Sequence, residues 1–244
     1  MHINLCKIKR NSSGGERQVI MQDYGNIIKL LSPISEQLIR LEKANSLMPT
    51  ELQEPKDFCD SICHVNLSRL SLYPQPSSFF TLCVKKNTIE ESFLYNEFLL
   101  KNQLKEANIE YSGYNFPIGA DCLKPDENTE IYTKGVNVMA VDAIGPWDPG
   151  KMTSSSKTRL IAKKENWKLS MFEILSFLAL NPGLIQALAR NKWSPSRYYL
   201  GGLCQNIDLT PFIYFDRQSN RLYFGASDSE EYRDDSSSPF VLKL

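Results

Sequence analysis

Histidine and cysteine are scarce in this chain. Its 244 residues include two histidines, His2 and His64, and six cysteines. Because histidine is the commonest general base in enzymes, its scarcity favours a protein without catalytic chemistry. The cysteines are widely spaced, and Cys83 and Cys204 lie among apolar residues, as the reduced thiols of a protein core do. This pattern predicts a reducing, cytoplasmic compartment.

Net charge is absent as well, since 28 basic residues balance 28 acidic ones. No global field therefore draws the chain to nucleic acid or to an anionic membrane. Charge is uneven only locally: residues 151–168 hold six Lys or Arg and one Glu, and residues 228–235 hold five acids and one Arg. Such runs usually form solvated faces. A nucleic-acid partner would rest on the basic run alone and is not expected.

An export signal is also lacking, because residues 1–18 carry basic side chains but no apolar segment. Residues 11–16 have the composition of a flexible linker. We expect residues 1–20 to form a flexible tail, and either Met1 or Met21 to be the native start.

One long apolar run is present. Residues 169–189 carry a single charged side chain, Glu173. A membrane span needs about 20 apolar residues, but Asn181-Pro182-Gly183 interrupts this run and favours a helix stop. Residues 170–173 have the S-x-x-E form of a capping box, which places Glu173 at a helix start rather than in lipid. The run therefore predicts a buried helix pair over 171–180 and 184–190 and no membrane span; a partner-binding helix is the alternative.

Periodicity and turn residues predict the other elements. Helical spacing covers residues 23–45, with Ser32 as the cap and Pro33 as the first residue of a restarted helix. A second amphipathic helix is predicted over 57–72, and the capping box Thr88–Glu91 opens a third that runs to residue 103. Strands are predicted at 79–84, 136–144, 158–163, 198–200, 211–215 and 221–225, the last two joined by a hairpin loop. The acidic, serine-rich residues 227–238 are expected to form a mobile surface segment.

The order of these elements does not alternate as βαβ units do, so we predict an α+β fold. Its N-terminal third is helical, and a mostly antiparallel sheet packs on the buried apolar helix pair. The predicted organisation is a tail (1–20), a helical segment (21–73) and an α+β domain (77–244), or one continuous domain over 21–244.

A series of short motifs runs through the second half of the chain: Val138–Asp142, Gly145, Phe172–Pro182, Ser196-Arg197 and Phe212–Gly225. The series resembles a family of uncharacterised bacterial proteins, a domain-of-unknown-function family. In that family a Val-x-Val-Asp strand leads to a Gly loop, an apolar helix ending near a Pro, a Ser-Arg turn and an apolar hairpin. The resemblance extends over residues 79–226 and implies a fold but no activity.

The strongest candidate for a ligand site follows the strand predicted at 136–144. Gly145-Pro-Trp-Asp-Pro-Gly150-Lys151 has the G-x-x-x-x-G-K spacing of a phosphate-binding loop. However, Met152 stands where Ser or Thr would ligate Mg²⁺, two prolines remove N–H donors, and residues 153–158 are Ser/Thr-rich rather than a helix start that holds phosphate. A looser anion site remains, formed by Gly145, Trp147, Gly150, Lys151, Lys157 and Arg159. The other interpretation is a Pro/Gly turn with a solvated basic edge.

Metal and cofactor sites are not predicted. Cys59, Cys63 and His64 form C-x₃-C-H, but zinc needs four ligands, or three and a water, and the sequence offers no second Cys or His pair. A cysteine–His64 dyad formed in space and an acid–base role for Asp142 stay open.

Taken together, these patterns predict a soluble, cytoplasmic, non-catalytic binding or accessory protein that recognises a protein partner or a small ligand. Its many tyrosines and its tryptophans are residue types favoured at recognition surfaces, although core aromatics explain them equally. The alternative function is an enzyme that acts on a phosphate- or carboxylate-bearing substrate at the Gly145–Arg159 loop.

Overall fold

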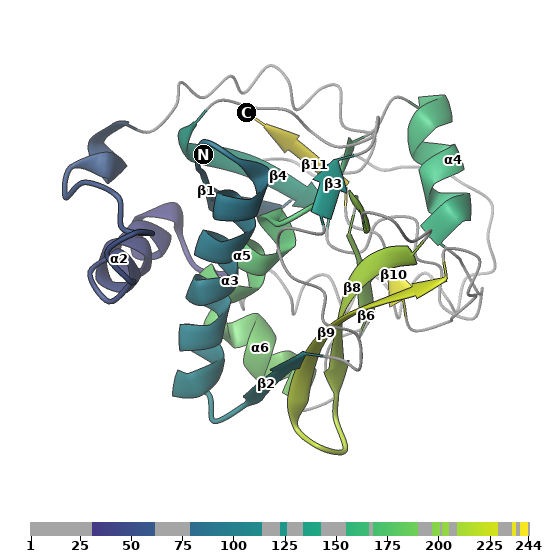
Figure 1. Cartoon of the computed structure of the whole chain (residues 1–244). Coiled ribbons are helices and arrows are strands. Elements are labelled where there is room, and N and C mark those ends of the chain that lie inside the picture. Colours follow the sequence, from purple (N-terminus) through teal and green to yellow (C-terminus); the bar gives the residue numbers. More distant parts are fainter. Residues whose placement is uncertain are drawn as a thin grey trace, which may run out of the picture.

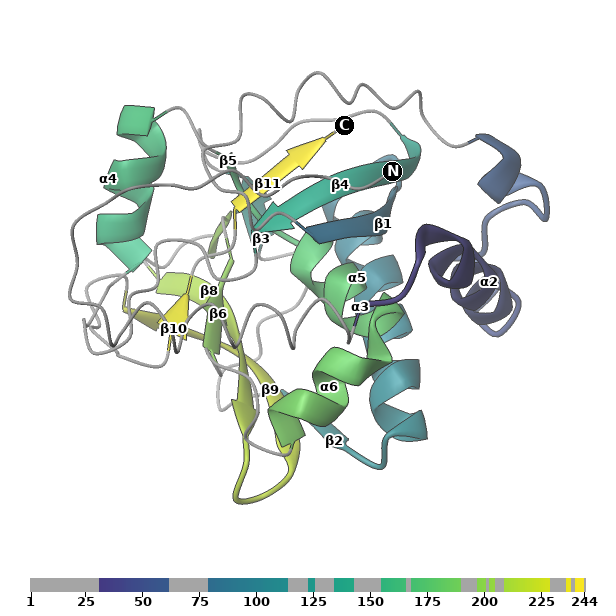
Figure 2. The same cartoon turned by 180° about the vertical axis from the view of Figure 1, so that it is seen from behind.

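The structure is a computed structural model, which describes residues 31–61, 79–113, 123–125, 134–142, 155–165, 168–189, 197–200, 202–204, 209–228, 236–237 and 240–243. Within these ranges helices and strands form a mixed α+β fold, as predicted (Figure 1). Helix α2 (Ile34–Asn45) and helix α4 (Ser155–Glu165) lie on opposite sides of the molecule, with the sheets between them (Figures 1 and 2). The predicted tail at 1–20 lies outside the described ranges.

Helix α2 begins directly after a proline. Pro33 occupies the N-cap position rather than the first helical position, and no side chain caps the helix there. The predicted cap, Ser32, instead accepts a hydrogen bond on its hydroxyl from Arg40 Nη1 at 2.7 Å and donates its backbone N–H to Asn181 Oδ1 at 2.8 Å. The cap assignment was wrong because the hydroxyl of Ser32 binds Arg40, its N–H binds Asn181 and its carbonyl accepts from Gln37 Nε2. Residues 23–30 of the predicted helix lie outside the described part of the chain.

The segment after α2 also differs from the prediction. Residues Phe58–Ser61 form a 3₁₀ helix, η1, rather than the start of an α-helix over 57–72, and residues 62–78 are not among those described. Phe58 N donates to Pro55 O at 3.0 Å. The two residues are three positions apart, which is the hydrogen-bond spacing of a 3₁₀ helix rather than of an α-helix. Phe58 and Cys59 are buried, so this turn contributes apolar side chains to the core.

The first sheet has the order β1-β4-β11-β5, and its three pairings are antiparallel. Its strands are β1 (Phe79–Lys85), β4 (Gly135–Asp142), β11 (Phe240–Lys243) and β5 (Lys168–Leu169). The strands predicted at 79–84 and 136–144 are β1 and β4, which pair from Phe79 opposite Val141 to Lys85 opposite Gly135. Leu82 and Cys83 point to opposite faces of β1 and both are fully buried, so this part of the sheet is covered on both sides.

Helix α3 (Ile89–Glu106) opens on the predicted capping box. Thr88 Oγ1 accepts from Glu91 N at 3.0 Å, and Glu91 Oε2 accepts from Thr88 N at 3.4 Å. The helix runs to Glu106, and Asn108, with φ 55°, then turns the chain into the next strand. Asparagine tolerates this left-handed conformation better than most residues.

Amide side chains from two helices cover the outer edge of β1. Gln37 Nε2 donates to Phe80 O at 3.1 Å, and Gln37 Oε1 accepts from Leu82 N at 3.0 Å. Asn96 repeats the pattern on Val84, donating to its carbonyl at 2.8 Å and accepting from its N–H at 3.5 Å. Both amides are fully buried. Since each offers one acceptor and a donor, they replace the partners that a neighbouring strand would supply.

The long apolar run forms two short helices, α5 (Glu173–Leu180) and α6 (Pro182–Ala189). The side chains predicted to be core residues are nearly or fully buried: Phe172, Leu175, Phe177 and Leu178. Among the described residues, no helix combines the length and the apolar character that crossing a bilayer requires.

The start of α5 corrects the predicted capping box in its detail. Helix α5 begins at Glu173, not Met171. Glu173 Oε2 accepts from the backbone N–H groups of Met171 at 2.7 Å and Phe172 at 3.1 Å, and Ser170 Oγ accepts from Ile174 N at 3.0 Å. The two side chains therefore satisfy N–H groups one or two positions further along the chain than a regular box does.

The second sheet has the order β10-β6-β8-β9-β2. Its strands are β10 (Ser236–Ser237), β6 (Arg197–Tyr199), β8 (Leu209–Asp216), β9 (Arg221–Asp228) and β2 (Glu110–Gly113); β3 (Leu123–Pro125) and β7 (Gly202–Cys204) form a separate antiparallel pair. The predicted hairpin is β8 and β9, whereas β10 pairs with β6 and β2 with β9 in parallel. Because β9 extends to Asp228 and β10 is Ser236–Ser237, four positions of the segment predicted to be mobile over 227–238 belong to strands of this sheet.

Helix α4 replaces the strand predicted at 158–163. Thr158 and Ala162, one helical turn apart, are fully buried, whereas Leu160 is exposed. A half-buried strand would bury every second residue, and it would therefore bury Leu160 together with the other two. The strand prediction was wrong because Lys, Arg, Leu and Ala favour a helix here and because the buried positions, Thr158 and Ala162, are one helical turn apart.

One continuous core joins these elements. It runs from Leu41 in α2 to Phe224 in β9, and the rings of Phe93 in α3 and Phe224 are 5.0 Å apart. Helix α5 contacts α3, β1 and β4, so the apolar run lies at the centre of the fold. Helix α2 shares this core with α3, α5 and β1.

Candidate functional site

The structure describes two of the six residues predicted for an anion site, Lys157 and Arg159, both on α4. The other four lie outside the described residues: Gly145, Trp147, Gly150 and Lys151. Two positions apart on a helix, the side chains of Lys157 and Arg159 diverge by about 200°. Lys157 is exposed, whereas Arg159 Nη2 donates to Leu200 O at 3.4 Å, next to β6. The helix therefore does not direct these two cations at one ligand.

Helix α4 begins where the sequence predicts no helix. Residues 153–158 were expected to lack a helix, but α4 begins at Ser155. Strand β4 is thus followed, after residues 143–154, by a helix, which is the order of elements around a phosphate-binding loop. Strand β4 lies between two antiparallel neighbours, whereas such loops are usual in parallel sheets.

The outer face of α4 carries a basic surface with an apolar centre, formed by Lys157, Leu160, Lys163 and Lys164. Leu160 is 69 % exposed, more than any other large apolar side chain in the described ranges, and the three lysines are exposed. These four side chains lie within about 120° of one another around the helix axis. Thr158 and Ala162 are buried on the opposite face. The helix therefore presents one face to the core and a basic, leucine-centred face to solvent.

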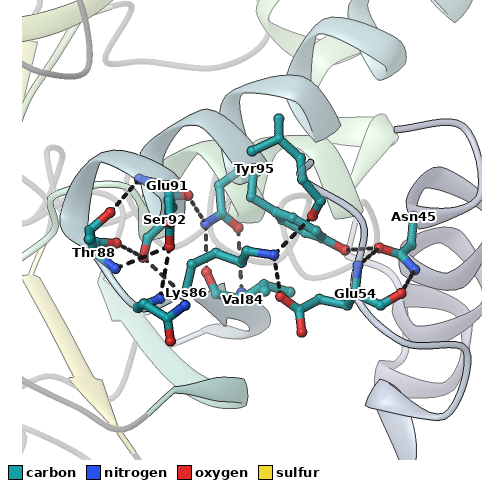
Figure 3. A network of polar contacts seen from close by, with 11 residues as sticks. Asn45, Glu54, Val84, Lys86, Thr88, Glu91, Ser92 and Tyr95 are labelled. Carbon is teal, nitrogen blue, oxygen red and sulfur yellow. Dashed lines mark hydrogen bonds and ion pairs between the residues drawn. The ribbon is translucent and has the colours of Figure 1, made fainter. Parts of the chain in front are cut away.

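A second concentration of polar groups, the Lys86 network, lies where β1, α3 and α2 meet (Figure 3). Lys86 forms an ion pair with Glu54, and these side chains are only 9 % and 11 % exposed. The Lys86 ammonium also donates to Leu52 O at 3.0 Å and lies 5.7 Å from the centre of the Tyr95 ring. Asn45 completes the network, because its side chain accepts from Tyr95 Oη at 3.2 Å and from Glu54 N at 2.8 Å.

The contacts of the Lys86 network indicate a structural role. Its members come from α2, from the segment after it, from the end of β1 and from α3, and its contacts with Leu52 and Glu54 tie residues 52–54 to the core. The carboxylate, ammonium, amide and phenol are all engaged with one another (Figure 3). A binding site needs polar groups that converge on an open space, and the groups of this network converge on each other.

Two tyrosines, the fully buried Tyr95 and the partly buried Tyr111, have strongly shifted acidities. Burial raises the pKa of Tyr95 well above its usual range. Burial and the carboxylate of Glu97 do the same for the pKa of Tyr111, whose hydroxyl donates to Glu97 Oε1 at 2.5 Å. Lys101 completes this second cluster, 2.8 Å from Glu97 Oε2 and 4.8 Å from the centre of the Tyr111 ring. Both phenols therefore act as fixed neutral donors.

Lys85 is a half-buried cation between α3 and the start of α5. Burial lowers the pKa of Lys85, and the charges of Glu173 and Glu91 partly oppose this shift. Its Nζ lies 3.4 Å from Ser92 Oγ and 5.9 Å from the centre of the Phe172 ring. Shifted lysines occur at active sites, but Ser92 already accepts the N–H of Lys86 and donates to Thr88 O, as a residue of a helix start does.

The cysteine motif contributes one described residue. Cys59 is buried in η1, and Cys63 and His64 are not among the described residues. Within the ranges that the structure describes, no three His, Cys, Asp or Glu side chains are grouped so that they could hold a metal ion. Cys83 is buried and outside any disulfide, and its Sγ lies 3.8 Å from Asn96 Oδ1.

A cavity of about 150 Å³ lies between α2, α3 and the end of α5. Its lining residues are Arg40, Lys43, Ala44, Leu47, Leu99, Asn102, Gln103, Glu106, Ala179 and Leu180. No motif indicates it, because three separate segments each supply part of its wall. The only local signal is the pairing of exposed cations with apolar residues on α2, which by itself is common at protein surfaces.

No family model, curated protein or solved structure compared with the chain matches it. The resemblance of residues 79–226 to a bacterial domain family therefore stays a prediction.

Proposed function

We propose that this chain is a non-catalytic, cytoplasmic binding or accessory protein that recognises an acidic protein partner through the outer face of α4. The observation that carries the proposal is Leu160, which is 69 % exposed at the centre of three exposed lysines. Cys83, buried and outside any disulfide, is consistent with the proposed compartment. The polar clusters around Lys86 and Tyr111 are engaged internally, which favours binding over catalysis.

The chemistry of this face specifies its partner. Burying a leucine side chain contributes about 1.5–3 kcal/mol, so Leu160 supplies affinity once it is covered. Lysines at the rim of an interface mainly raise the association rate and select the sign of the partner's charge. The complementary surface therefore presents an apolar side chain or pocket surrounded by Asp and Glu, as an acidic amphipathic helix does.

A designed peptide tests the proposal directly. The probe is a fluorescent helical peptide with leucines on one face and glutamates on the flanks, and its binding to the full chain is followed by anisotropy. Leu160→Ala is expected to weaken binding about tenfold, since it removes most of the buried apolar area. Lys163→Glu/Lys164→Glu should weaken it further and reduce its dependence on salt.

The matched control for the charge reversal is Lys56→Glu/Lys105→Glu, which changes the same number of exposed lysines elsewhere. This control should bind the peptide as the wild-type chain does. Equal loss in both double variants would mean that net charge alone drives binding, and would overturn the α4 assignment. A DNA duplex of arbitrary sequence is the second comparison ligand. If it binds more tightly than the peptide, and if Lys163→Glu/Lys164→Glu weakens its binding too, the partner of this face is a nucleic acid and not an acidic protein.

A second candidate function is an enzyme that acts on a phosphate- or carboxylate-bearing substrate at residues 145–159, the segment predicted as a loop, of which 155–159 form the start of α4. The helix that begins at Ser155 favours it, because a helix start after a Gly-rich loop is where anions bind. Phosphate at millimolar concentration should then raise the melting temperature, and Lys151→Ala should abolish this increase without lowering the melting temperature of the ligand-free protein. If the increase is absent or survives the substitution, this candidate is wrong.

A further inference from the structure

We propose that the cavity between α2, α3 and α5 binds a small carboxylic acid with a short apolar body. This site is independent of the outer face of α4, since α2 and α4 lie on opposite sides of the molecule (Figures 1 and 2). It therefore adds a small-molecule ligand to the proposed protein partner.

The apolar part of the cavity limits the size of the ligand. Leu99, Ala179 and Leu180 are buried and line it, while Leu47 lies on its wall with 62 % of its surface exposed. The volume of about 150 Å³ is close to that of an engineered protein cavity that holds benzene. The body of the ligand is therefore about the size of one six-membered ring or a chain of similar volume. Covering it would also remove part of Leu47 from water.

The polar part of the cavity selects a carboxylate. Arg40 is held in place, because Nη1 donates to Ser32 Oγ and, at 3.4 Å, to Leu180 O, while Nη2 pairs with Glu36 at 3.2 Å. A guanidinium fixed in this way loses little freedom when it binds a carboxylate. Lys43, which also lines the cavity, supplies a second cation from α2. Glu106 pairs with Lys43 at 3.3 Å on the exposed rim, and this exposed pair is easily opened.

An unsatisfied donor on the α3 wall supports a ligand that carries oxygen. Asn102 Nδ2 is buried and has no hydrogen-bond partner among the described residues, and Asn102 lines the cavity. Native structures contain few buried donors without partners. Asn102 Nδ2 has almost no accessible surface, so its side chain must rotate toward the cavity before it can donate to a carboxylate oxygen whose other oxygen meets Arg40.

The experiment is a titration of the ¹⁵N-labelled full chain followed by amide chemical shifts. Benzoate is the probe, and benzyl alcohol, of similar shape but without charge, is the comparison ligand. Benzoate is expected to cause saturable shifts at residues 40–47, 99–106 and 179–180, and benzyl alcohol should bind about tenfold more weakly because it lacks the charged hydrogen bonds. Equal binding of the two compounds would overturn the assignment of a carboxylate.

Two variants test the location. Ala44→Phe fills the cavity from α2 and should abolish the benzoate shifts, whereas Ser35→Phe, at an exposed position of the same helix, should leave them unchanged. Lys43→Glu, also exposed, should weaken benzoate binding at least tenfold relative to Lys56→Glu, and it keeps the test decisive if Ala44→Phe does not fold. Absence of saturable shifts up to about 20 mM, where binding with millimolar dissociation constants is visible, or shifts that persist in both cavity variants, would overturn the proposal.

Discussion

The ion pair between Lys86 and Glu54 leads to the sharpest prediction about stability. Lys86→Met keeps most of the side-chain volume but removes the ammonium, which leaves the Glu54 carboxylate, only 11 % exposed, without its partner. It also leaves Leu52 O without the donor that now lies 3.0 Å away. Breaking a buried pair by removing one partner costs about 3–5 kcal/mol. Because a small part of both side chains reaches solvent, we expect about 3 kcal/mol, a large share of a typical unfolding free energy of about 5–15 kcal/mol.

The assay is urea unfolding at neutral pH, with far-UV circular dichroism and tryptophan fluorescence as two probes whose transitions should coincide. The double variant Lys86→Met/Glu54→Leu should return to within about 1 kcal/mol of the wild-type chain, because the pair is replaced by apolar groups. The control is Lys43→Met at the exposed pair with Glu106, which should cost less than about 1 kcal/mol. If Lys86→Met costs no more than this control, solvent screens the pair and the Lys86 network does not hold residues 52–54 on the core.

Three further predictions concern the core and the shifted acidities. Phe177→Ala, at a fully buried position of α5, should cost about 3–5 kcal/mol in the same unfolding assay; a loss below about 1 kcal/mol would mean that α5 is not central to the core. Because burial raises the pKa of Tyr95 and Tyr111, their contribution to stability is complete below the ordinary tyrosine pKa of about 10 and is lost as the pH rises above it. Replacing both with Phe should therefore leave the native tyrosinate absorbance between pH 9 and 11 unchanged, and a smaller signal would contradict their burial. The hydroxyl of Ser219, which donates to Asp216 Oδ2 at 2.6 Å, lowers the pKa of that carboxyl, so Ser219→Ala should raise it in an NMR titration, and an unchanged value would assign the shift to the backbone instead.

Local signals were sufficient wherever one short segment determines the structure. The capping box at Thr88–Glu91, the hairpin of β8 and β9 and the burial of Phe177 all followed from residues close together in sequence. In the capping box and the hairpin the partners that satisfy the backbone lie close together in the sequence, and the burial of Phe177 follows from the apolar run around it.

Predictions failed where distant contacts compete with local preference. Ser32 has the right side chain to cap α2, yet its hydroxyl accepts from Arg40 and its N–H binds Asn181, far away in the sequence. Residues 158–163 contain both a strand-like apolar pair and a helical spacing of Thr158 and Ala162, and only the docking surface decides between them. Periodicity alone does not separate such short segments.

The candidate sites illustrate the same limit. The basic run points to Lys157, but the strand predicted at 158–163 does not place Leu160 on the same exposed face as Lys157. The residues that line the cavity between α2, α3 and α5 share no sequence motif. Arg40, Asn102 and Leu180 come together only in the folded chain. Convergent polar groups from separate elements are a property of tertiary structure, which spacing along one segment does not encode.

The amide cover on β1 has a consequence for how the protein fails. Gln37 belongs to α2, whereas Asn96 belongs to α3, so a fluctuation that releases only α2 uncovers Phe80 O and Leu82 N while the rest of the sheet persists. An uncovered strand edge pairs readily with the same edge of another molecule. Mild heating or dilute denaturant should therefore produce intermolecular dimers and fibres before global unfolding. The lifetime of the α2 contact, more than total stability, would then set the shelf life of the protein in concentrated solution.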